Sequence, residues 1–459
     1  MDSRMKITIT DFNQHGQGVG QDANGLVHFV DGALPGETVM VSIERKSASY
    51  VVSSIHDILI PSPDRTEPPC PVFERCGGCS LQHLNYDAEL RWKEQRVLTA
   101  LERIGKLDTS EIDIYPIIGM EDPWRYTNKA SYPFTGTADA PVTGFYATRS
   151  HQIVPHDDCL LLTDATNEVK RIVLGLMKRD KISPYNEKEH EGILRHLVVR
   201  HTCATNELMV VFVVTKLPEV MKKWPAELAK ALETSKIETK LVSSYAIENH
   251  RRSNVVLRGK AIHLYGEEAV TETLNGISFS LRPEAFFQVN TKQAEKLFSI
   301  VEAWTTEAIA TSPKKQALDL YCGSGTIALH LARQGVEVTG VEIVPEAIDE
   351  ARASAIKNDI SLANFKAADI VDYVQSEGVR DAVSLVVLDP PRKGCDQRLL
   401  DALLKSDHVQ TIVYVSCNPA TLARDLGYLS ESFAIKRLQA VDMFPHTTHV
   451  ETLCLLSRK

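Results

Sequence analysis

Residues 316–325 read QALDLYCGSG, an apolar run that passes directly into a glycine-rich turn and then into a helical stretch. The same alternation of apolar strand and helix continues along the chain. The strands that it predicts are QALDLYC, EVTGVEI, FKAADI, AVSLVVLDP and TIVYVSCN. This alternation is typical of a doubly wound parallel sheet. The last two apolar runs, IKRLQAVDMF and HVETLCLLS, are joined by a short link, so we expect these strands to pair antiparallel.

The chain before this sheet has a different organisation. Residues 5–58 contain short strands broken by glycines, which predicts a small β-barrel of the oligonucleotide-binding kind. A proline-rich stretch at 60–71 marks a boundary. Residues 85–105 are predicted to form an amphipathic helix that ends at Gly105 and is able to pack on the parallel-sheet domain.

Strands and helices are mixed between residues 115 and 275, with strands predicted at HLVVRHT, LMVVFVVT and VVLRG. We therefore expect a multidomain protein: a barrel at 1–59, a central α+β domain at 60–275 and an α/β domain at 276–459.

The composition is that of an ordinary globular protein, with 43% hydrophobic and 24% charged residues in 459. We find neither an apolar run long enough to cross a membrane nor a signal peptide, and expect a cytoplasmic protein. The net charge of −9 argues against a general nucleic-acid binder. Residues 191–260 nevertheless hold twelve Lys or Arg against seven Asp or Glu, and a solvated surface is the simplest reading of that excess. The basic residues and histidines in question are Arg195, Arg200, Arg251, Arg252, Arg258, His196, His201 and His250.

The glycine-rich turn predicts a cofactor site. Gly323 and Gly325 let the backbone approach a ligand closely and leave helix-start amides facing it. The next strand ends in Glu342, whose carboxylate can accept hydrogen bonds from ribose hydroxyls. The same pattern fits the loose fingerprint of an NAD site. The motif Asp389-Pro-Pro-Arg at the end of the fourth strand favours S-adenosylmethionine instead.

Two further groups predict a reaction centre. Cys417 ends the fifth strand, and the helix that begins at Pro419 should favour its thiolate form. Glu451 begins the last strand, and because that strand is antiparallel, its start lies at the edge where the parallel strands end. Cys417, Glu451 and Asp389 should therefore converge. A thiol and a carboxylate at one edge can act as nucleophile and base.

A second cysteine set lies outside this domain. Cys70, Cys76 and Cys79 fall within ten residues flanked by Pro and Gly, and Cys159 follows later. Four thiolates can hold an iron–sulfur cluster or zinc. Unligated thiols in a loop are the alternative.

Five segments of the chain together resemble the RNA 5-methyluridine (uracil-C5) methyltransferase family, and the resemblance covers nearly the whole chain. They are Ala285-Phe-Phe-Gln288-Val-Asn290, Asp319-Leu-Tyr-Cys-Gly-Ser-Gly-Thr326, Asp389-Pro-Pro-Arg-Lys-Gly394, Ser416-Cys-Asn-Pro419 and His449-Val-Glu451-Thr.

The resemblance implies a Rossmann-like methyltransferase domain in which Cys417 attacks carbon 6 of uracil and Glu451 removes the carbon 5 proton. It implies S-adenosylmethionine contacts from Gln288, Tyr321, Glu342 and Asp389, beside the glycines 323 and 325. The cysteine spacing resembles the [4Fe–4S] site of family members that act on ribosomal RNA, and the barrel resembles their TRAM domain. The implied partner is 23S ribosomal RNA, bound by a monomer.

The target uridine would be unstacked and turned into the pocket. Phe287 and Arg392 are candidate contacts to RNA, with core packing the simpler account of Phe287. Four alternatives stay open: a transfer-RNA methyltransferase, a cytosine-C5 methyltransferase, an NAD and iron–sulfur oxidoreductase, and a non-catalytic RNA assembly factor.

Overall fold

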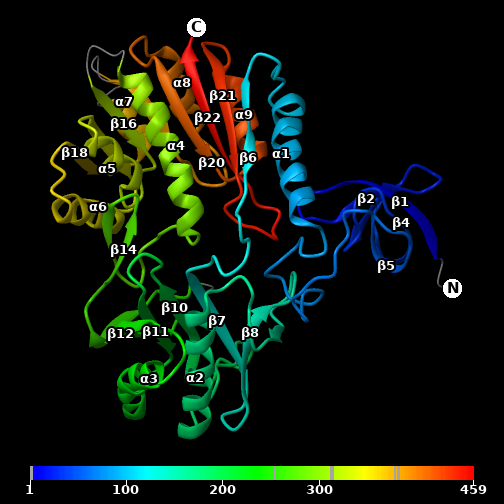
Figure 1. Ribbon diagram of the computed structural model, residues 1–459, viewed down its shortest axis with the longest axis vertical. Helices are drawn as coiled ribbons and strands as arrows, with labels where there is room; N and C mark the ends of the chain where they lie inside the picture. The colour runs from blue at the N-terminus through cyan, green and yellow to red at the C-terminus, as the bar shows by residue number, and fades with distance from the viewer. Residues whose placement is uncertain (1–3, 253–254, 311–314, 377–378, 380–382) are drawn as a thin grey trace. The chain divides into compact units, whose positions relative to one another are not determined.

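The computed structural model describes residues 4–252, 255–310, 315–376, 379 and 383–459 (Figure 1). The chain separates into two compact units. The first comprises the chain up to Lys93 with residues 145–154 and 444–449, and the second comprises the remainder. Residues 1–3 of the predicted barrel and Ala382 of one predicted strand lie outside the described residues.

Five strands of the first unit close into the predicted barrel, in the order β1-β2-β3-β5-β4. Their bounds are β1 Met5–Phe12, β2 Gly18–Gln21, β3 Val27–Asp31, β4 Thr38–Lys46 and β5 Tyr50–Ile60. Successive side chains of a strand point to opposite faces, and Ile7, Ile9 and Val41 belong to the apolar interior. Gly20 is needed where β1 and β2 pair, since a Cβ there would lie 2.4 Å from the Thr8 carbonyl oxygen.

Helix α1 (Tyr86–Arg103) begins in the first unit and holds a buried ion pair. Glu89 and Lys93, one helical turn apart, bring their charged groups to 2.6 Å. Glu89 also accepts a hydrogen bond from the His446 amide at 2.8 Å, and the Lys93 amino group donates to the Phe444 carbonyl at 3.1 Å. These contacts fix residues 444–449 against the start of α1.

A seven-stranded mixed sheet forms the central region, in the order β13-β12-β11-β10-β7-β8-β9. Its strands are β7 Lys129–Gly136, β8 Pro141–Tyr146, β9 Ile153–Pro155, β10 Leu194–His201, β11 Glu207–Val214, β12 Lys240–Glu248 and β13 Lys260–Gly266. The helices of this region are α2 Asp164–Asp180, the short 3₁₀ helix η1 Glu219–Lys223 and α3 Trp224–Glu233. The central strand β11 is buried over all but its first residue, which accounts for its continuous apolar sequence.

The strand predicted at VVLRG, residues 255–259, is wrong. This segment is a turn, and β13 begins only at Lys260. The Asn249 side-chain amide donates to the carbonyl oxygens of Val255 and Val256, both at 3.1 Å. Backbone groups that would join a strand ladder are thus satisfied by a side chain.

The C-terminal region contains an eight-stranded sheet in the order β18-β17-β16-β19-β20-β22-β21-β6. Its strands are β6 Asp113–Ile118, β16 Gln316–Leu320, β17 Glu337–Glu342, β18 Ala363–Ala367, β19 Val383–Leu388, β20 Thr411–Ser416, β21 Phe433–Val441 and β22 Glu451–Arg458. The helices are α4 Thr291–Ala310, α5 Thr326–Arg333, α6 Pro345–Lys357, α7 Ile370–Ser376, α8 Gln397–Lys405 and α9 Pro419–Leu429. A separate hairpin, β14 Val270–Leu274 and β15 Ile277–Leu281, precedes α4.

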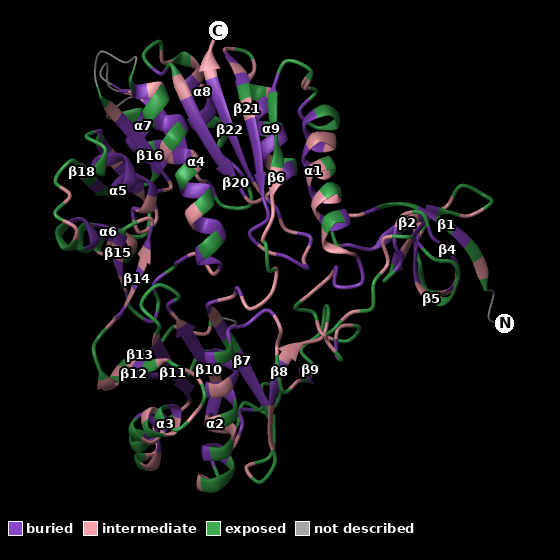
Figure 2. Ribbon diagram, in the orientation of Figure 1, coloured by how far each residue is buried: buried purple, intermediate pink, exposed green. Residues whose placement is uncertain are grey.

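The pairing agrees with the predicted parallel sheet. Strands β18, β17, β16, β19 and β20 are parallel, and β22 runs antiparallel to both β20 and β21. The edge strand β6 comes from the segment before the central sheet and pairs parallel with β21. Figure 2 shows the inner strands of this sheet as largely buried.

The apolar core of this sheet also includes Val97, Ala100 and Leu101 of α1. None of the helices in the described ranges combines the length and apolar character needed to span a bilayer.

Candidate active site

The predicted site residues lie at one edge of the eight-stranded sheet, within the second unit. Tyr321 follows β16, Glu342 ends β17, Asp389 follows β19 and Cys417 follows β20. Glu451 begins β22, which runs in the opposite direction. The carboxyl ends of parallel strands are the usual ligand edge of such sheets.

The turn after β16 has the backbone form that its glycines predicted. Tyr321, Gly323 and Gly325 have φ angles of 66°, 52° and 81°. A Cβ on Gly325 would lie 2.7 Å from the Phe365 ring, whereas a Cβ on Gly323 would meet nothing within 4 Å. Gly325 is therefore required by packing, and Gly323 lies beside open space that a ligand can enter.

Glu342 is held next to this turn. One carboxylate oxygen accepts from the Val344 amide at 3.0 Å, and the other from the Gly323 amide at 3.4 Å. These bonds orient the carboxylate at the end of β17, where a ribose would be bound.

Sequence reasoning missed Asp319, although it opens the glycine motif. Its side chain is fully buried, and one oxygen accepts from the Ala328 amide at 2.9 Å. No partner is found for the other oxygen within the described part of the chain. Burial, and then the nearby charges of Asp389 and Glu342, raise the pKa of Asp319 to about 8.

The segment that contains Gln288 is fixed by the central region. The Arg200 guanidinium donates to the Ala285 carbonyl at 2.5 Å. The Asn128 side-chain amide donates to the Gln288 carbonyl at 3.0 Å, and its backbone amide donates to Val289. Gln288 lies in the segment that precedes α4, which begins at Thr291. The predicted contact of Gln288 with the cofactor stays a prediction.

The two phenylalanines before Gln288 differ in environment. Phe287 is buried, and its ring lies 5.4 Å from that of Phe279, as core packing predicts. Phe286 is 73% exposed. The sequence indicated only Phe287 as a candidate RNA contact, because an apolar run does not reveal which of two adjacent rings faces solvent.

Cys417 and Glu451 are brought together by strand register. In the β20–β22 ladder Thr411 pairs with Ser457 and Ser416 pairs with Thr452. The same register, continued by one residue, places Cys417 opposite Glu451. The two side chains therefore lie on neighbouring strand ends.

The expectation that the helix after Cys417 favours its thiolate is wrong for the cofactor-free protein. Burial, followed by the negative charges of Glu451 and Asp389, raises the pKa of Cys417 to about 11. The positive charge of Arg392 acts in the opposite direction. Desolvation and two acidic neighbours thus outweigh the helix N-terminus.

The acidic groups of the site are themselves shifted. Burial raises the pKa of Glu451 to about 8, with a further contribution from Asp389 and an opposing one from Arg392. Burial raises the pKa of Asp389 to about 7. A cationic sulfonium would relieve this accumulation of acidic groups, whereas the phosphates of NAD would increase it. The donor set therefore fits S-adenosylmethionine better than NAD.

The loop that carries Asp389 is fixed against α9. The Asn418 side-chain amide and the Thr421 hydroxyl donate to the Arg392 carbonyl, at 3.0 and 3.2 Å. Asp425, fully buried, accepts from the Cys395 amide at 2.8 Å and from the Tyr414 hydroxyl at 2.7 Å. Sequence reasoning missed Asp425, since nothing in its helix distinguishes it from a surface residue.

Gly394 completes this loop, and its backbone conformation requires glycine. Its φ is 78°, and a Cβ there would lie 2.5 Å from the Arg424 guanidinium and 2.6 Å from the Asp425 carboxylate. The Asp389 loop can therefore pack this closely against α9 only with glycine at this position.

The predicted metal ligands are divided between the units. Cys70, Cys76 and Cys79 belong to the first unit and Cys159 to the second. The Gly78 amide donates to the Cys76 sulfur at 3.5 Å. Within the described residues, no group of three or more His, Cys, Asp or Glu side chains is arranged to hold a metal ion. The side-chain arrangement therefore does not display a metal centre, and no chemical step is assigned to one.

Comparison with known proteins agrees with the geometry of the site. Residues 188–459 match the family model described as tRNA (uracil-5-)-methyltransferase, and residues 3–55 match the TRAM domain. An uncharacterized RNA methyltransferase of Clostridium acetobutylicum is 39% identical and covers 99% of this chain and 96% of its own length. Another from Halalkalibacterium halodurans is 40% identical, with the same coverage.

One solved structure is similar over nearly the whole chain. It is the tRNA (uracil-54, C5)-methyltransferase of Pyrococcus abyssi in complex with S-adenosyl-L-homocysteine, with a TM-score of 0.77 and 29% identity. The alignment covers 98% of this chain and 99% of that one. The chain therefore belongs to the tRNA (uracil-5-)-methyltransferase family of S-adenosylmethionine-dependent RNA methyltransferases and carries an N-terminal TRAM domain.

Proposed function

We propose that this protein methylates carbon 5 of a uridine in RNA, with Cys417 as the nucleophile and Glu451 as the base. One observation carries the proposal: the β20–β22 register places Cys417 opposite Glu451, beside Asp389 and at the ligand edge of the sheet. The cofactor side of the same edge is formed by Tyr321, Gly323, Gly325 and Glu342, with Gln288 assigned there by family resemblance.

The first step is addition of the Cys417 sulfur to carbon 6 of the uracil. The thiol proton must leave as the S–C6 bond forms, because the pKa of Cys417 is raised to about 11. The acceptor is a carboxylate of the site. The C5–C6 double-bond electrons move to the carbonyl at carbon 4, which gives an enolate nucleophilic at carbon 5. Bound S-adenosylmethionine would supply the methyl group to carbon 5 as an electrophile, and S-adenosylhomocysteine would be the leaving group.

The second step restores the aromatic base. Glu451 in its ionised form accepts the proton from carbon 5, the C5–C6 double bond re-forms, and the Cys417 sulfur leaves carbon 6. A carboxyl group with a pKa near 8 suits this task, because it binds a proton far more readily than an exposed glutamate does. The oxidoreductase and assembly-factor alternatives leave Cys417 and Glu451 unused. A cytosine-C5 methyltransferase would need the same thiol attack, and we prefer uracil because the Ser416-Cys-Asn-Pro419 and His449-Val-Glu451-Thr segments resemble the uracil family.

For the RNA we propose 23S ribosomal RNA, on the resemblance of the barrel and cysteine spacing to ribosomal RNA enzymes. Transfer RNA is the second candidate, and a specific observation favours it. The Pyrococcus abyssi protein, named for tRNA uracil 54, aligns with 98% of this chain, barrel region included. The barrel by itself therefore does not separate the two substrates. Action as a monomer in the cytoplasm remains part of the proposal.

The spacing of Cys70, Cys76, Cys79 and Cys159 supports a [4Fe–4S] cluster, with zinc as the alternative. The test is independent of activity: iron, sulfide and zinc are measured in anaerobically purified protein. The matched pair is Cys76→Ala and Cys203→Ala, the second an exposed cysteine outside the set. We expect iron and sulfide in wild type and in Cys203→Ala, and a loss in Cys76→Ala. Zinc without iron would replace the iron–sulfur cluster with a zinc site. The absence of both iron and zinc would refute a metal site at these cysteines.

The activity test uses the intact protein with isotope-labelled S-adenosylmethionine and unmodified ribosomal or transfer RNA, followed by nucleoside mass spectrometry. We expect label in 5-methyluridine from ribosomal RNA, with Cys203→Ala as active as wild type and Cys417→Ala inactive. Label in transfer RNA alone would overturn the ribosomal assignment and keep the chemistry. Label in 5-methylcytidine, or in neither RNA, would overturn the proposed function.

A further inference from the structure

We propose that a cavity at the end of β12 and the start of β13 binds phosphates of the RNA backbone, far from the reacting base. The inference rests on the proposed RNA substrate. It explains the basic excess of residues 191–260, which the active site leaves unused. Of the five arginines noted there, Arg195 and Arg200 are buried and hold backbone carbonyls, whereas Arg251, Arg252 and Arg258 are exposed.

A cavity of about 340 Å³ lies at this loop. Its lining consists of Glu248, His250, Arg251, Arg258, Gly259 and Lys260. Two guanidinium groups, an ammonium group and an imidazole thus surround it with one carboxylate. An oxygen of that carboxylate accepts from the Leu217 amide at 3.1 Å. The formal balance of the lining is positive, which suits a phosphate group.

Buried polar groups fix the backbone that presents these cations. Arg195 donates to the carbonyl oxygens of Asn249 and Arg251, both at 2.8 Å. Its guanidinium also lies over the Tyr185 ring, 4.5 Å from the ring centroid. On the other side, the buried Asn249 accepts from the Arg251 amide at 2.9 Å and holds the turn at Val255 and Val256. Backbone that is held in place before binding, here residues 249–251 and 255–256, loses less entropy when a ligand binds.

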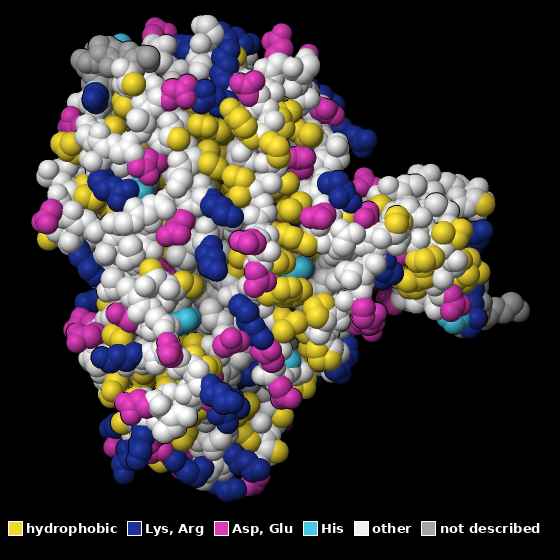
Figure 3. Space-filling view, viewed as in Figure 1, with side chains coloured by type: hydrophobic (Ala, Val, Ile, Leu, Met, Phe, Trp, Pro, Cys, Tyr) yellow, Lys and Arg dark blue, Asp and Glu magenta, His cyan; other side chains and the backbone are white. Residues whose placement is uncertain are grey.

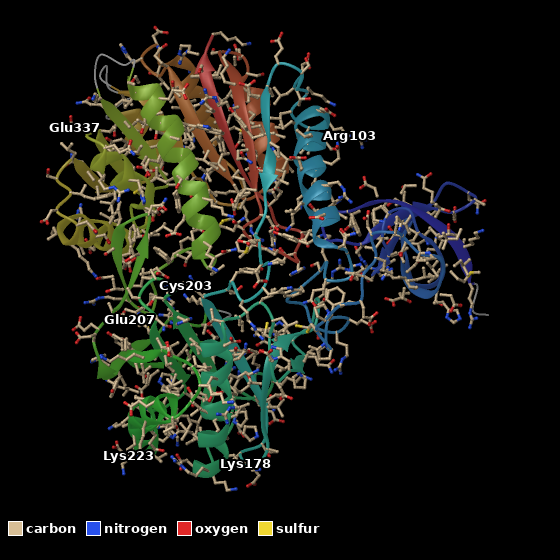
Figure 4. The ribbon with its side chains drawn as sticks, viewed as in Figure 1. Arg103, Lys178, Cys203, Glu207, Lys223 and Glu337 are labelled. Atoms are coloured by element: carbon tan, nitrogen blue, oxygen red, sulfur yellow. The ribbon has the colours of Figure 1, made fainter. Side chains whose placement is uncertain are left out.

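The site lies at the edge of the central sheet opposite the catalytic edge. His201 and Glu207 end β10 and begin β11 on the catalytic side, next to the residues that hold the 285–290 segment. Glu248, beside Val214, lies at the other end of β11. Eight strand residues span roughly 27 Å. Figure 4 shows Cys203 and Glu207 at one end of the central region, and Lys178 of α2 and Lys223 of η1 at the other.

The charge distribution favours RNA as the occupant. A protein of net charge −9 repels a polyanion unless positive groups are concentrated where the RNA passes. Figure 3 shows Lys and Arg side chains gathered over the end of the second unit that carries α2 and α3, the same end as the cavity. An RNA stem that extends from the target loop by roughly one helical turn would be long enough to run from the catalytic end of β11 to this cavity.

The test compares binding of two labelled RNA stem-loops with the same loop, one with a minimal stem and one extended by about one helical turn. Fluorescence anisotropy is measured over a range of salt concentrations. The test variant carries Arg251→Ala, Arg258→Ala and Lys260→Ala. The control variant carries Arg103→Ala, Lys405→Ala and Lys436→Ala, three exposed cations outside the cavity with the same loss of charge.

We expect the test variant to bind the extended RNA at least tenfold more weakly at low salt. The slope of log affinity against log salt concentration should also become shallower, by the equivalent of roughly two to three lost phosphate contacts. The test variant's binding of the minimal RNA and its single-turnover rate at saturating RNA should equal those of the control. Equal affinities of the two variants for the extended RNA would overturn the site. The RNA assignment would also be overturned if the three substitutions weakened binding of an acidic peptide and left binding of the extended RNA unchanged. The anisotropy measurement reports RNA binding and does not depend on catalysis. A wild-type protein that binds RNA through this cavity but does not methylate uridine would therefore refute the proposed function and leave the binding site intact.

Discussion

Cys417 and Glu451 face each other across the ends of two antiparallel strands, β20 and β22, in the register set by the Ser416–Thr452 pair. Burial and the negative charge of Asp389 raise the pKa of both groups, and the Glu451 carboxylate raises the pKa of Cys417 further. Cys417 is therefore held as a thiol in the cofactor-free protein.

The first prediction separates the two catalytic roles. Cys417→Ala should transfer no methyl group, because no other group can add to carbon 6. Glu451→Gln should transfer the methyl group and then stop, since an amide cannot accept the carbon 5 proton. A covalent protein–RNA adduct that carries label should accumulate in Glu451→Gln and be visible in a denaturing gel. Turnover by either variant at near the wild-type rate would refute the mechanism.

Thiol reactivity tests the electrostatic relationship directly. Glu451→Gln removes one of the negative charges that raise the pKa of Cys417, so the rate of Cys417 alkylation should rise severalfold at pH 9. Alkylation is measured by peptide mass spectrometry without cofactor or RNA, with Cys203 of the same protein as the internal control. An unchanged rate at Cys417 would show that the Glu451 charge does not contribute to its pKa.

The pH dependence of the reaction follows from Glu451. Its pKa is raised to about 8, so its basic form increases as the pH rises from 7 to 9. Proton removal from carbon 5 should accelerate over the same range, about tenfold per pH unit where the acid form predominates. The measurement is decay of the methylated adduct in single turnover. A rate that is flat across this range would exclude Glu451 as the base.

Gly394 tests the packing of the Asp389 loop. Gly394→Ala places a Cβ 2.5 Å from Arg424 at a positive φ, so the loop must move and the turnover number should fall at least tenfold. Gly175→Ala is the matched control. Gly175 lies within α2 with nothing within 4 Å of an added Cβ, and helix propensity there favours alanine by about 1 kcal/mol. Equal activity of the two variants would show that the loop tolerates displacement.

Asp319 should make stability depend on pH in the cofactor-free protein. Its folded-state pKa is raised to about 8, so the folded protein keeps a proton that the unfolded chain loses near pH 4. The associated stability is complete below the unfolded pKa and is lost as the pH rises through 8, by up to about 1.4 kcal/mol per pH unit. Asp319→Asn should flatten the fall in melting temperature between pH 5 and 8. If melting temperature fell equally with pH in wild type and in Asp319→Asn, the conclusion that Asp319 is protonated in the folded protein would be wrong.

Much of the fold followed from local patterns. The alternation of strand and helix after residue 315 gives the observed parallel sheet, and the short link before β22 gives its antiparallel last strand, because chain connectivity restricts how neighbouring strands pair. The barrel followed from strand length and turn glycines. The strand predicted at VVLRG failed because a side chain from outside the segment, Asn249, captures its carbonyl oxygens. No local pattern records such a contact.

The sequence by itself predicted which groups carry the proposed chemistry and determined at which sheet edge they lie, because strand direction decides where each strand ends. Only the tertiary structure decided how those groups ionise. The thiol of Cys417, expected as a thiolate from its helix, is held protonated by burial and by Asp389 and Glu451, which are distant in sequence. Long-range packing also decided which phenylalanine is exposed, that Asp319 and Asp425 are buried, and that distal arginines surround a cavity. Solvation and charge depend on every element packed around a group, and that environment exists only once the chain has folded.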